Sequence, residues 1–423
     1  MSGVAAQHGR LLPSRVAEVV RPAGQRMLTF VAVLTVGWAV ARVGGLTGLH
    51  RAPEYLTLAT ALLAVGLFAS TYGIDLRAAS GNVRLVLVAV SLGVLVKALL
   101  ISGVLYLAFQ RPEYLVLGVA VAQIDPLSFA AARLQSRMSG QAKAILSAWA
   151  SFDDPITILL TVYVSAWVLP LLDQPGGQPL PISGDSGLAT FGLSVAQNLL
   201  FALAAYGLWR LTEWPAGRVA RLTGGSRVWW GRLRLGIQLL LLAGLVGFAV
   251  WQFLMLGLAL AGLFYRPPIE PVLHRLTQGA FLLATFALGL VLVGGIRPGP
   301  GIVLGVAAYA AHALVATLIG ARLPGQDRID LLLGQQNGIT AIILALLLEP
   351  TFPGTVAVVA PAVVTVNLLH TLANAVRESY RRPIVAQIPR PVGTSASAAA
   401  GAPTGDALAA SGGERAEDGA PDP

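Results

Sequence analysis

The sequence predicts an all-α polytopic membrane protein with about twelve transmembrane helices. Hydrophobic residues make up 55% of its 423 residues and charged residues only 12%, so the chain has too few polar side chains to cover a soluble globule. The apolar residues gather in segments close to the roughly 20 residues that a helix needs to cross a bilayer. Cysteine is absent, which excludes disulfides, thiolate metal sites and cysteine nucleophiles.

The predicted spans follow one another from residue 27 to residue 377. The seventh and eighth come from a single apolar stretch, residues 233–265, which fits either one very long helix or two short ones. The spans have approximate limits of 27–44, 54–73, 83–109, 113–134, 141–169, 187–211, 233–250, 251–265, 273–295, 299–321, 328–348 and 354–377.

Basic residues between the spans predict the orientation. They occur in alternate loops, and the loop at 170–187 has none. Because basic loops stay in the cytoplasm, both termini are expected there, on the inner side of the cell membrane, and this requires residues 233–265 to cross twice. Topology thus explains the net charge of +9, which does not indicate nucleic-acid binding. The basic residues used are Arg77, Arg84, Arg133, Arg137, Lys143, Arg210, Arg218, Arg221, Arg227, Arg232, Arg234, Arg377, Arg381 and Arg382.

Three regions are predicted along the chain. Residues 1–26 form a cytoplasmic N-terminal segment with no recognisable signal peptide, and residues 27–377 form the transmembrane domain. Residues 378–423 turn to Ala, Gly, Pro, Ser and Thr, a composition that cannot bury enough surface to offset its ordering entropy. This last region is predicted to be a disordered cytoplasmic tail.

An internal repeat links the fourth and eleventh predicted spans. At an offset of about 212 residues, Gln123-Ile-Asp125-Pro126 aligns with Gln335-Gln336-Asn337-Gly338. The segments occupy equivalent places in two six-helix halves, and the odd number of crossings between them gives opposite orientations, the arrangement of inverted-repeat transporters. The helix breakers Pro126 and Gly338 therefore predict that the fourth and eleventh helices are broken.

Adjacent carboxylates lie at membrane depth in the fifth predicted span. Asp153 and Asp154 fall inside an apolar run from about Ile145 to Leu169, where a charged side chain costs about 2.5–3.5 kcal/mol on insertion scales. Such residues are rare and by default functional, although a structural hydrogen-bonded pair is an alternative. With Asp125 they form the candidate ion- and proton-binding set.

The chemistry around these aspartates suits a hard cation. Pro126 and Pro155 each follow an aspartate directly, and because proline lacks an N–H they are predicted to interrupt the helices and free carbonyl oxygens. Carboxylate and carbonyl oxygens together predict a transient Na⁺ site at Asp125, Asp153 and Asp154. Competition between a proton and a cation for the same carboxylates would couple the two fluxes. Neighbouring helical residues point about 100° apart, so one of Asp153 and Asp154 is expected to be the carrier and the other a modulator.

Two other ionisable residues are predicted deep in the membrane. Lys97 in the third span and His312 in the tenth could each neutralise an aspartate when the ion is absent. The alternatives are a lysine that extends to the membrane interface and a neutral histidine bonded to a backbone carbonyl. Three amide side chains, those of Gln123, Gln336 and Asn337, are expected to line the same site.

These motifs resemble those of the monovalent cation:proton antiporter superfamily. Gln-Ile-Asp125-Pro126 is similar to its Thr-Asp-Pro motif, and Phe-Asp153-Asp154-Pro155 is similar to its Asn-Asp or Asp-Asp motif one helix later. His312-Ala-Leu-Val lies where members carry Arg-Ala-Leu-Val or a lysine, and Asn337-Gly lies where many carry Arg-Gly. The resemblance covers most of residues 27–377 and has no counterpart in the tail.

The resemblance implies a homodimeric, inverted-repeat sodium/proton antiporter with an elevator-like core and no cofactor, not an enzyme. It implies that Asp154 is the shared carrier of H⁺ and of Na⁺, with Li⁺ or K⁺ as other cations, and that Asp125 lines the crossing of the broken helices. Asp153 occupies the position that is Asp in electrogenic members. The chain departs from the family at His312 and Asn337, which replace basic residues.

Other functions remain open from the residues alone. A sodium-coupled symporter of an organic anion could share the architecture, and would need a roomy polar cavity. An intramembrane aspartyl protease also needs two aspartates, but its Gly-x-Gly-Asp motif is missing, and adjacent aspartates suit ion binding better than a shared-proton pair. A non-transporting sensor or scaffold would leave the buried carboxylates without a purpose.

Overall fold

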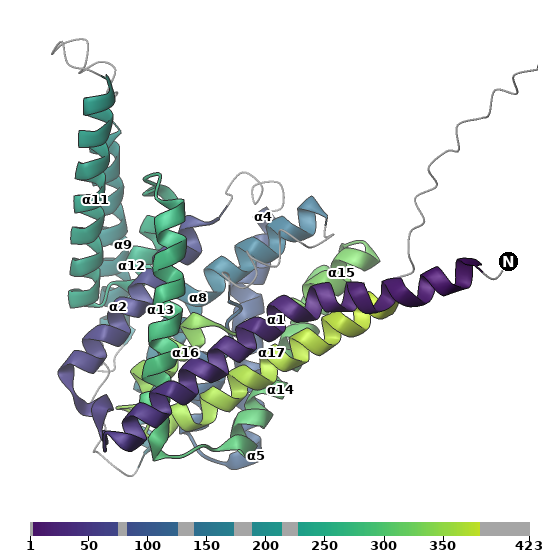
Figure 1. Ribbon diagram of the computed structural model, residues 1–423. Helices are drawn as coiled ribbons and strands as arrows, with labels where there is room; N and C mark the ends of the chain where they lie inside the picture. The colour runs from purple at the N-terminus through teal and green to yellow at the C-terminus, as the bar shows by residue number, and fades with distance from the viewer. Residues whose placement is uncertain (1–2, 75–82, 126–138, 173–187, 214–226, 381–423) are drawn as a thin grey trace, which may run out of the picture. The chain divides into compact units, whose positions relative to one another are not determined.

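The computed structural model describes residues 3–74, 83–125, 139–172, 188–213 and 227–380, and within these ranges the chain is helical with no β-strand (Figure 1). The helices are α1 (Gly3–Val43), α2 (Pro53–Tyr72), α4 (Val83–Val88), α5 (Val94–Phe109), α6 (Glu113–Ala120), α8 (Gly140–Val168), α9 (Leu188–Thr212), α11 (Arg227–Gln252), α12 (Met255–Phe264), α13 (Glu270–Val291), α14 (Pro298–Ile319), α15 (Gly325–Leu332), α16 (Ile339–Leu348) and α17 (Thr355–Tyr380).

Nine helices in the described ranges are long and apolar enough to cross a membrane, and α12 and α16 are shorter apolar helices. The prediction of an all-α, multi-pass membrane protein is therefore confirmed. The count of twelve crossings and the inverted symmetry of two six-helix halves stay predictions.

The ambiguous apolar stretch at residues 233–265 forms two helices. α11 ends at Gln252 and α12 begins at Met255. Between them Phe253 has a φ of 55°, in the left-handed region that a bulky residue rarely adopts. The chain thus changes direction sharply at Phe253, and the one-helix alternative is wrong.

The first and third spans differ from the simple helices predicted. α1 begins at Gly3, so that residues 3–26 extend the same helix whose apolar part starts at Gly24. In the third span a π-helical turn at Ala89–Gly93 joins α4 to α5, and Lys97 lies one turn beyond it. Such turns insert an extra residue and occur often near functional sites. The tail was predicted to begin at residue 378, but α17 continues to Tyr380, and the rest of the predicted tail lies outside the described residues.

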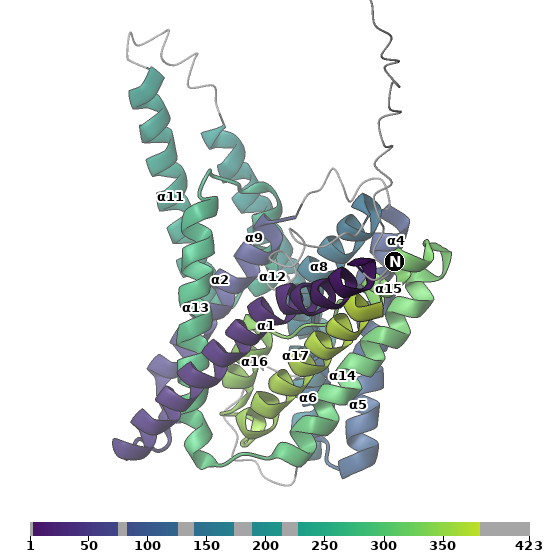
Figure 2. The same ribbon diagram turned by 45° about the vertical axis from the view of Figure 1, so that its right-hand side comes forward.

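Glycines allow close packing between helices that are distant in the sequence. A Cβ at Gly37 of α1 would lie 2.3 Å from the carbonyl oxygen of Phe286, and one at Gly289 of α13 would lie 2.2 Å from that of Leu34. α14 packs on α17 in a similar way through Gly305. Small residues at such contacts let the backbones approach closely, and the resulting van der Waals packing favours helix association in lipid. The result is that α1 packs against both α13 and α17, and that α17 packs against α14 (Figures 1 and 2).

Both spans that were predicted to be broken lose their helix where the repeat motif begins. α15 ends at Leu332 and α16 starts at Ile339, so residues 333–338 are not helical. α6 ends at Ala120, and residues 121–125 are likewise not helical. The fourth helix thus ends before Pro126, which itself lies outside the described residues. We refer to residues 121–125 and 333–338 as the crossing segments.

Candidate functional site

The crossing segments bind each other through main-chain and amide groups. The main-chain N–H of Asp125 donates a hydrogen bond to the carbonyl oxygen of Gln336 at 2.8 Å. The side-chain amide of Gln335 donates to the carbonyl oxygen of Gln123 at 2.9 Å. Non-helical backbone at membrane depth must find such partners, because neither lipid nor a neighbouring turn supplies them. These bonds hold the two crossing segments together.

Asn337 connects three parts of the structure. Its side-chain amide donates to the carbonyl oxygen of Val121 at 3.2 Å, and its side-chain oxygen accepts from Gln335 at 2.7 Å. Its main-chain N–H donates to Asn367 of α17 at 3.2 Å, and the Asn367 amide donates back to the Asn337 carbonyl at 2.8 Å. The neutral amide of Asn337 thus connects the two crossing segments with each other and with α17.

Gln336 points toward α17. Its side-chain Nε2 lies 2.7 Å from Nε2 of His370, whose Nδ1 lies 2.8 Å from the carbonyl oxygen of Leu333. The sequence placed the Gln336 side chain in the lining of the ion site, whereas the glutamine that reaches across the crossing is Gln335. The reason is geometric: successive side chains of an extended segment point to opposite sides.

Asp125 lies against the start of α16. A Cβ at Gly338 would come within 2.0 Å of the Asp125 carboxylate, so only glycine permits this approach. Gly338 is the N-cap of α16, whose first N–H groups have no partner within the helix. Since the N-terminal end of a helix carries a partial positive charge, it stabilises the buried carboxylate of Asp125.

Asp154 faces the same place from α8. Its Oδ2 accepts a hydrogen bond from the hydroxyl of Thr340, in the first turn of α16, at 3.0 Å. It is fully buried and interacts electrostatically with Asp125. Two carboxylates from separate spans, and a hydroxyl from a third element, therefore meet at the crossing.

Asp153 has a different set of partners. Its Oδ2 lies 2.6 Å from Nζ of Lys97, and both side chains are fully buried. The same oxygen accepts from the main-chain N–H of Ile124 at 2.8 Å. The Lys97 ammonium also lies 5.5 Å from the ring centre of Trp149, within cation–π range. Asp153 and Asp154 thus face different partners, as their positions on one helix require.

His312 does not contact an aspartate through a hydrogen bond. Its Nε2 lies 2.9 Å from the carbonyl oxygen of Leu331, and its ring centre lies 5.0 Å from that of Trp149. Of the two candidates for the counter-charge, the structure therefore pairs Lys97 with an aspartate and gives His312 the backbone-bonded arrangement.

Pro155 does not break its helix, which corrects the sequence prediction. α8 continues from Gly140 to Val168 with Pro155 inside it. The carbonyl of Ser151, four residues earlier, accepts a hydrogen bond from the Ser70 hydroxyl of α2 at 3.3 Å. The carbonyl that proline frees is thus satisfied by a neighbouring helix, which is how helices in membranes tolerate proline.

Several oxygens around the aspartates are buried and, among the described residues, have no hydrogen-bond partner. They are Asp154 Oδ1, Asp153 Oδ1, Thr157 Oγ1 and Gln123 Oε1. Thr157 lies three residues after Asp154 and so shares its face of α8. In the described part of the chain no three acidic or histidine side chains are grouped to hold a metal ion. The transient Na⁺ site at Asp125, Asp153 and Asp154 stays a prediction, and one oxygen of Asp153 is paired with Lys97.

Sequence reasoning missed Gln335, Thr340, Asn367 and His370 as members of the site. Gln335 and Thr340 lie in the repeat motif, where Gln335 aligns with Gln123. Asn367 and His370 are three residues apart in an otherwise apolar span, so they lie on one face of α17. That spacing was a usable signal.

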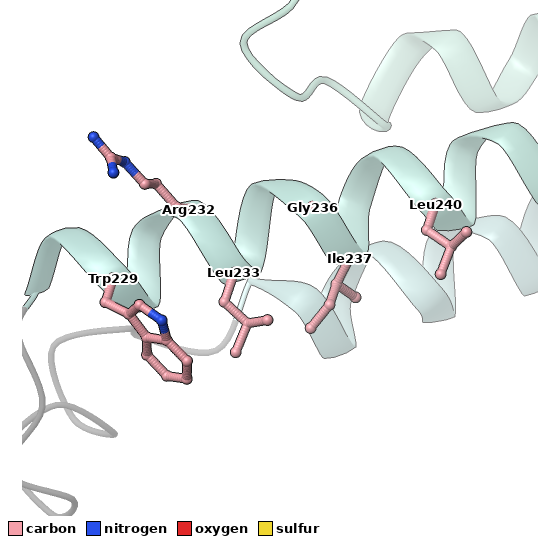
Figure 3. Close-up of a pocket in the computed structure, with 6 residues that line it drawn as sticks. All are labelled: Trp229, Arg232, Leu233, Gly236, Ile237 and Leu240. Carbon is pink, nitrogen blue, oxygen red and sulfur yellow. The ribbon is translucent and has the colours of Figure 1, made fainter.

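A surface hollow lies away from these residues. Figure 3 shows that Trp229, Arg232, Leu233, Gly236, Ile237 and Leu240 line it, all from α11. One helix with exposed apolar side chains is the expected appearance of a surface that faces lipid. The hollow has no part in the aspartate site.

The structure is similar to that of the sodium/proton antiporter MjNhaP1 from Methanocaldococcus jannaschii. One structure of that protein, at pH 8, matches with a TM-score of 0.57 and 15% sequence identity, covering 90% of this chain and 100% of that chain. A three-dimensional electron-microscopy map of it matches with a TM-score of 0.52 and 16% identity, covering 89% and 94%. The sequence matches no protein-family model and no curated protein.

At this identity the likeness shows the fold. The chain has the fold of that antiporter over about 90% of its length, and the predicted all-α polytopic fold is therefore confirmed. A fold alone does not specify a function, so the function of this chain depends on the side chains at the crossing segments.

Proposed function

We propose that the protein is a secondary antiporter that exchanges protons for a monovalent cation, with Na⁺ as the first candidate and Li⁺ or K⁺ as others. The observation that carries this proposal is the unequal charge balance of the two neighbouring aspartates. Lys97 is paired with Asp153, whereas Asp154 accepts a hydrogen bond from the neutral hydroxyl of Thr340. A buried carboxylate without a counter-charge must gain a positive charge or a proton.

Asp125 strengthens the requirement. It is a second buried carboxylate in electrostatic contact with Asp154, so both are destabilised when ionised together. A cation between them, or a proton on either, relieves the repulsion. Because cation and proton satisfy the same requirement, binding of one excludes the other, and this exclusion couples the fluxes.

The ligands that we assign to the cation are oxygens. Asp154 supplies the primary carboxylate and Asp125 the second, and Thr157 and Gln123 have buried oxygens available for the same purpose. Such an all-oxygen set suits a hard cation. Asp153 contributes through its ion pair with Lys97, which keeps a second full negative charge from the site.

We propose that this exchange takes place in a cell membrane, in a homodimer with both chain termini in the cytoplasm. An intramembrane protease is disfavoured, because its Gly-x-Gly-Asp motif is missing from the sequence. A sodium-coupled symporter of an organic anion makes a different prediction, namely flux of labelled solute without proton movement.

The test uses the purified full-length protein in liposomes with an imposed proton gradient. Adding Na⁺ outside should dissipate the gradient, and repeating the assay with Li⁺ and K⁺ identifies the cation. Asp154→Asn should abolish the response, because the amide can neither take up a proton nor neutralise a cation. Glu54→Gln, at an exposed carboxylate in the first turn of α2, is the matched control and should respond like the wild type. Undiminished exchange by Asp154→Asn would overturn the proposal.

A further inference from the structure

α17 holds one crossing segment at two points. Asn367 bonds to both main-chain groups of Asn337, and His370 bonds to the side chain of Gln336 and to the carbonyl of Leu333. Together these bonds reach from one end of residues 333–338 almost to the other. Asp125, Asp153 and Asp154 are not partners in these four bonds.

The hydrogen bonds define the protonation state of the His370 ring. A backbone carbonyl can only accept, so Nδ1 must carry the hydrogen that it shares with Leu333. The Gln336 group facing Nε2 is an amide N–H₂, which can only donate, so Nε2 must accept. Both bonds exist together only when the imidazole is neutral.

A second proton on His370 is incompatible with this arrangement. Nε2–H would face the Gln336 amide donor, and the pair would have to separate or the amide would have to turn. The backbone carbonyl of Gln335 is the other acceptor that a charged ring can reach. The ionisable groups that act on His370 from the helices packed on α17 are Arg26 of α1 and His312 of α14, and α16 has none. Neither Arg26 nor His312 offers a negative charge to stabilise the imidazolium.

We propose that His370 is a proton-sensitive positioning residue whose neutral form holds the crossing segment 333–338 against α17, and whose protonation releases the side chain of Gln336. Release of the Gln336 side chain would affect the ion site through the main chain of Gln336. The carbonyl of Gln336 is the acceptor for the main-chain N–H of Asp125. Acid therefore loosens the position of Asp125 by a route separate from proton binding at the carboxylates.

The first test does not depend on transport. Thermal unfolding of the detergent-solubilised full-length protein is followed at pH 8 and at pH 5. A histidine in the unfolded chain titrates near pH 6.5, and the native bonds need the neutral ring, so their stabilisation is present above that value and is lost as the pH falls below it. His370→Gln keeps an acceptor for Gln336 and cannot titrate. It should reduce the wild-type difference in Tm between the two pH values by about 2 °C or more.

His274→Gln is the control. His274 of α13 also lies beside a glutamine amide, with its Nε2 2.9 Å from Gln278, but this pair is exposed. The control should retain the full wild-type difference in Tm. An equal difference in wild type, His370→Gln and His274→Gln would overturn the proposal, whatever the protein transports.

The second test rests on the proposed antiport. Proton competition at the carboxylates raises the cation concentration needed for half-maximal exchange, whereas loss of positioning lowers the maximal rate itself. At saturating Na⁺, the maximal exchange rate of the wild type should decrease between pH 7 and pH 5.5. The decrease in the maximal rate of His370→Gln over the same pH range should be several-fold smaller. A parallel fall in both proteins would refute the role of His370. An absence of exchange in the wild type would instead refute the antiport proposal and leave the unfolding result to decide on His370.

Discussion

Asp153 and Asp154 are neighbours in one helix, yet they have opposite surroundings. Asp153 receives a lysine and a main-chain N–H on a single oxygen, all of them buried. Asp154 receives one hydroxyl and lies in the field of another carboxylate. Two adjacent aspartates in one helix can therefore have separate roles. Asp153 is part of a buried ion pair, and Asp154 is the residue at which we propose that a mobile charge binds.

The largest effect on stability is expected from removing the cation of the Lys97–Asp153 ion pair. Lys97→Met should lower the free energy of unfolding by about 3–5 kcal/mol, because it leaves Asp153 buried with an unmatched charge. Chemical unfolding of the detergent-solubilised protein measures the loss. Adding Asp153→Asn to Lys97→Met should restore a large part of the stability, since no unpaired charge then remains.

The control for this prediction is Arg232→Met, at an exposed cation of α11, which should change stability by less than about 0.5 kcal/mol. If Lys97→Met were as mild as Arg232→Met, the ion pair would have little energetic weight, and the contrast between the aspartates would fail.

A smaller loss of stability is expected from removing the hydrogen bond that Asp154 accepts from Thr340. Thr340→Val keeps the shape of the side chain and removes the hydroxyl that donates to Asp154. Hydrogen bonds to charged groups contribute about 1.5–3 kcal/mol, so stability should fall by that amount at neutral pH in excess Na⁺, where the proposed cation keeps Asp154 ionised. Thr340→Ser retains the hydroxyl and should retain most of the stability. Equal losses in the two variants would mean that packing of the methyl group, and not the bond to Asp154, decides the result.

The smallest loss of stability is expected at Gly338, beside the carboxylate of Asp125. Gly338→Ala would put a Cβ into the carboxylate of Asp125, and relief of this overlap should cost about 1–3 kcal/mol and shift Asp125 away from Asp154. Gly103→Ala in α5 is the matched control, because a Cβ there meets no atom within 4 Å and should stabilise the helix by up to about 1 kcal/mol. Melting temperatures of the two variants give the comparison, and a Gly338→Ala protein as stable as Gly103→Ala would contradict it.

The parts of the site that the sequence predicted are those that depend on local chemistry. Asp125 and Asp154 stand out because a charge in an apolar segment is costly wherever the segment packs. Gly338 was predicted to interrupt a helix, and the structure has the N-terminus of α16 there. Pro155 was misjudged because its effect depends on Ser70, which is 81 residues away in the chain from the carbonyl that proline frees.

The amino-acid sequence is sufficient to predict a multi-pass helical protein, a helix that starts after Gly338 and carboxylates within apolar segments. These properties follow from hydropathy, helix-breaking residues and the cost of burying charge, all of which act within one segment. Three contacts are evident only from the tertiary structure. Lys97, and not His312, is paired with an aspartate, and Gln335, and not Gln336, bonds to the other crossing segment. His370 of α17 bonds to the crossing segment 333–338. Each of these choices depends on a contact between segments far apart in the chain, and periodicity within a segment carries no information about its partner.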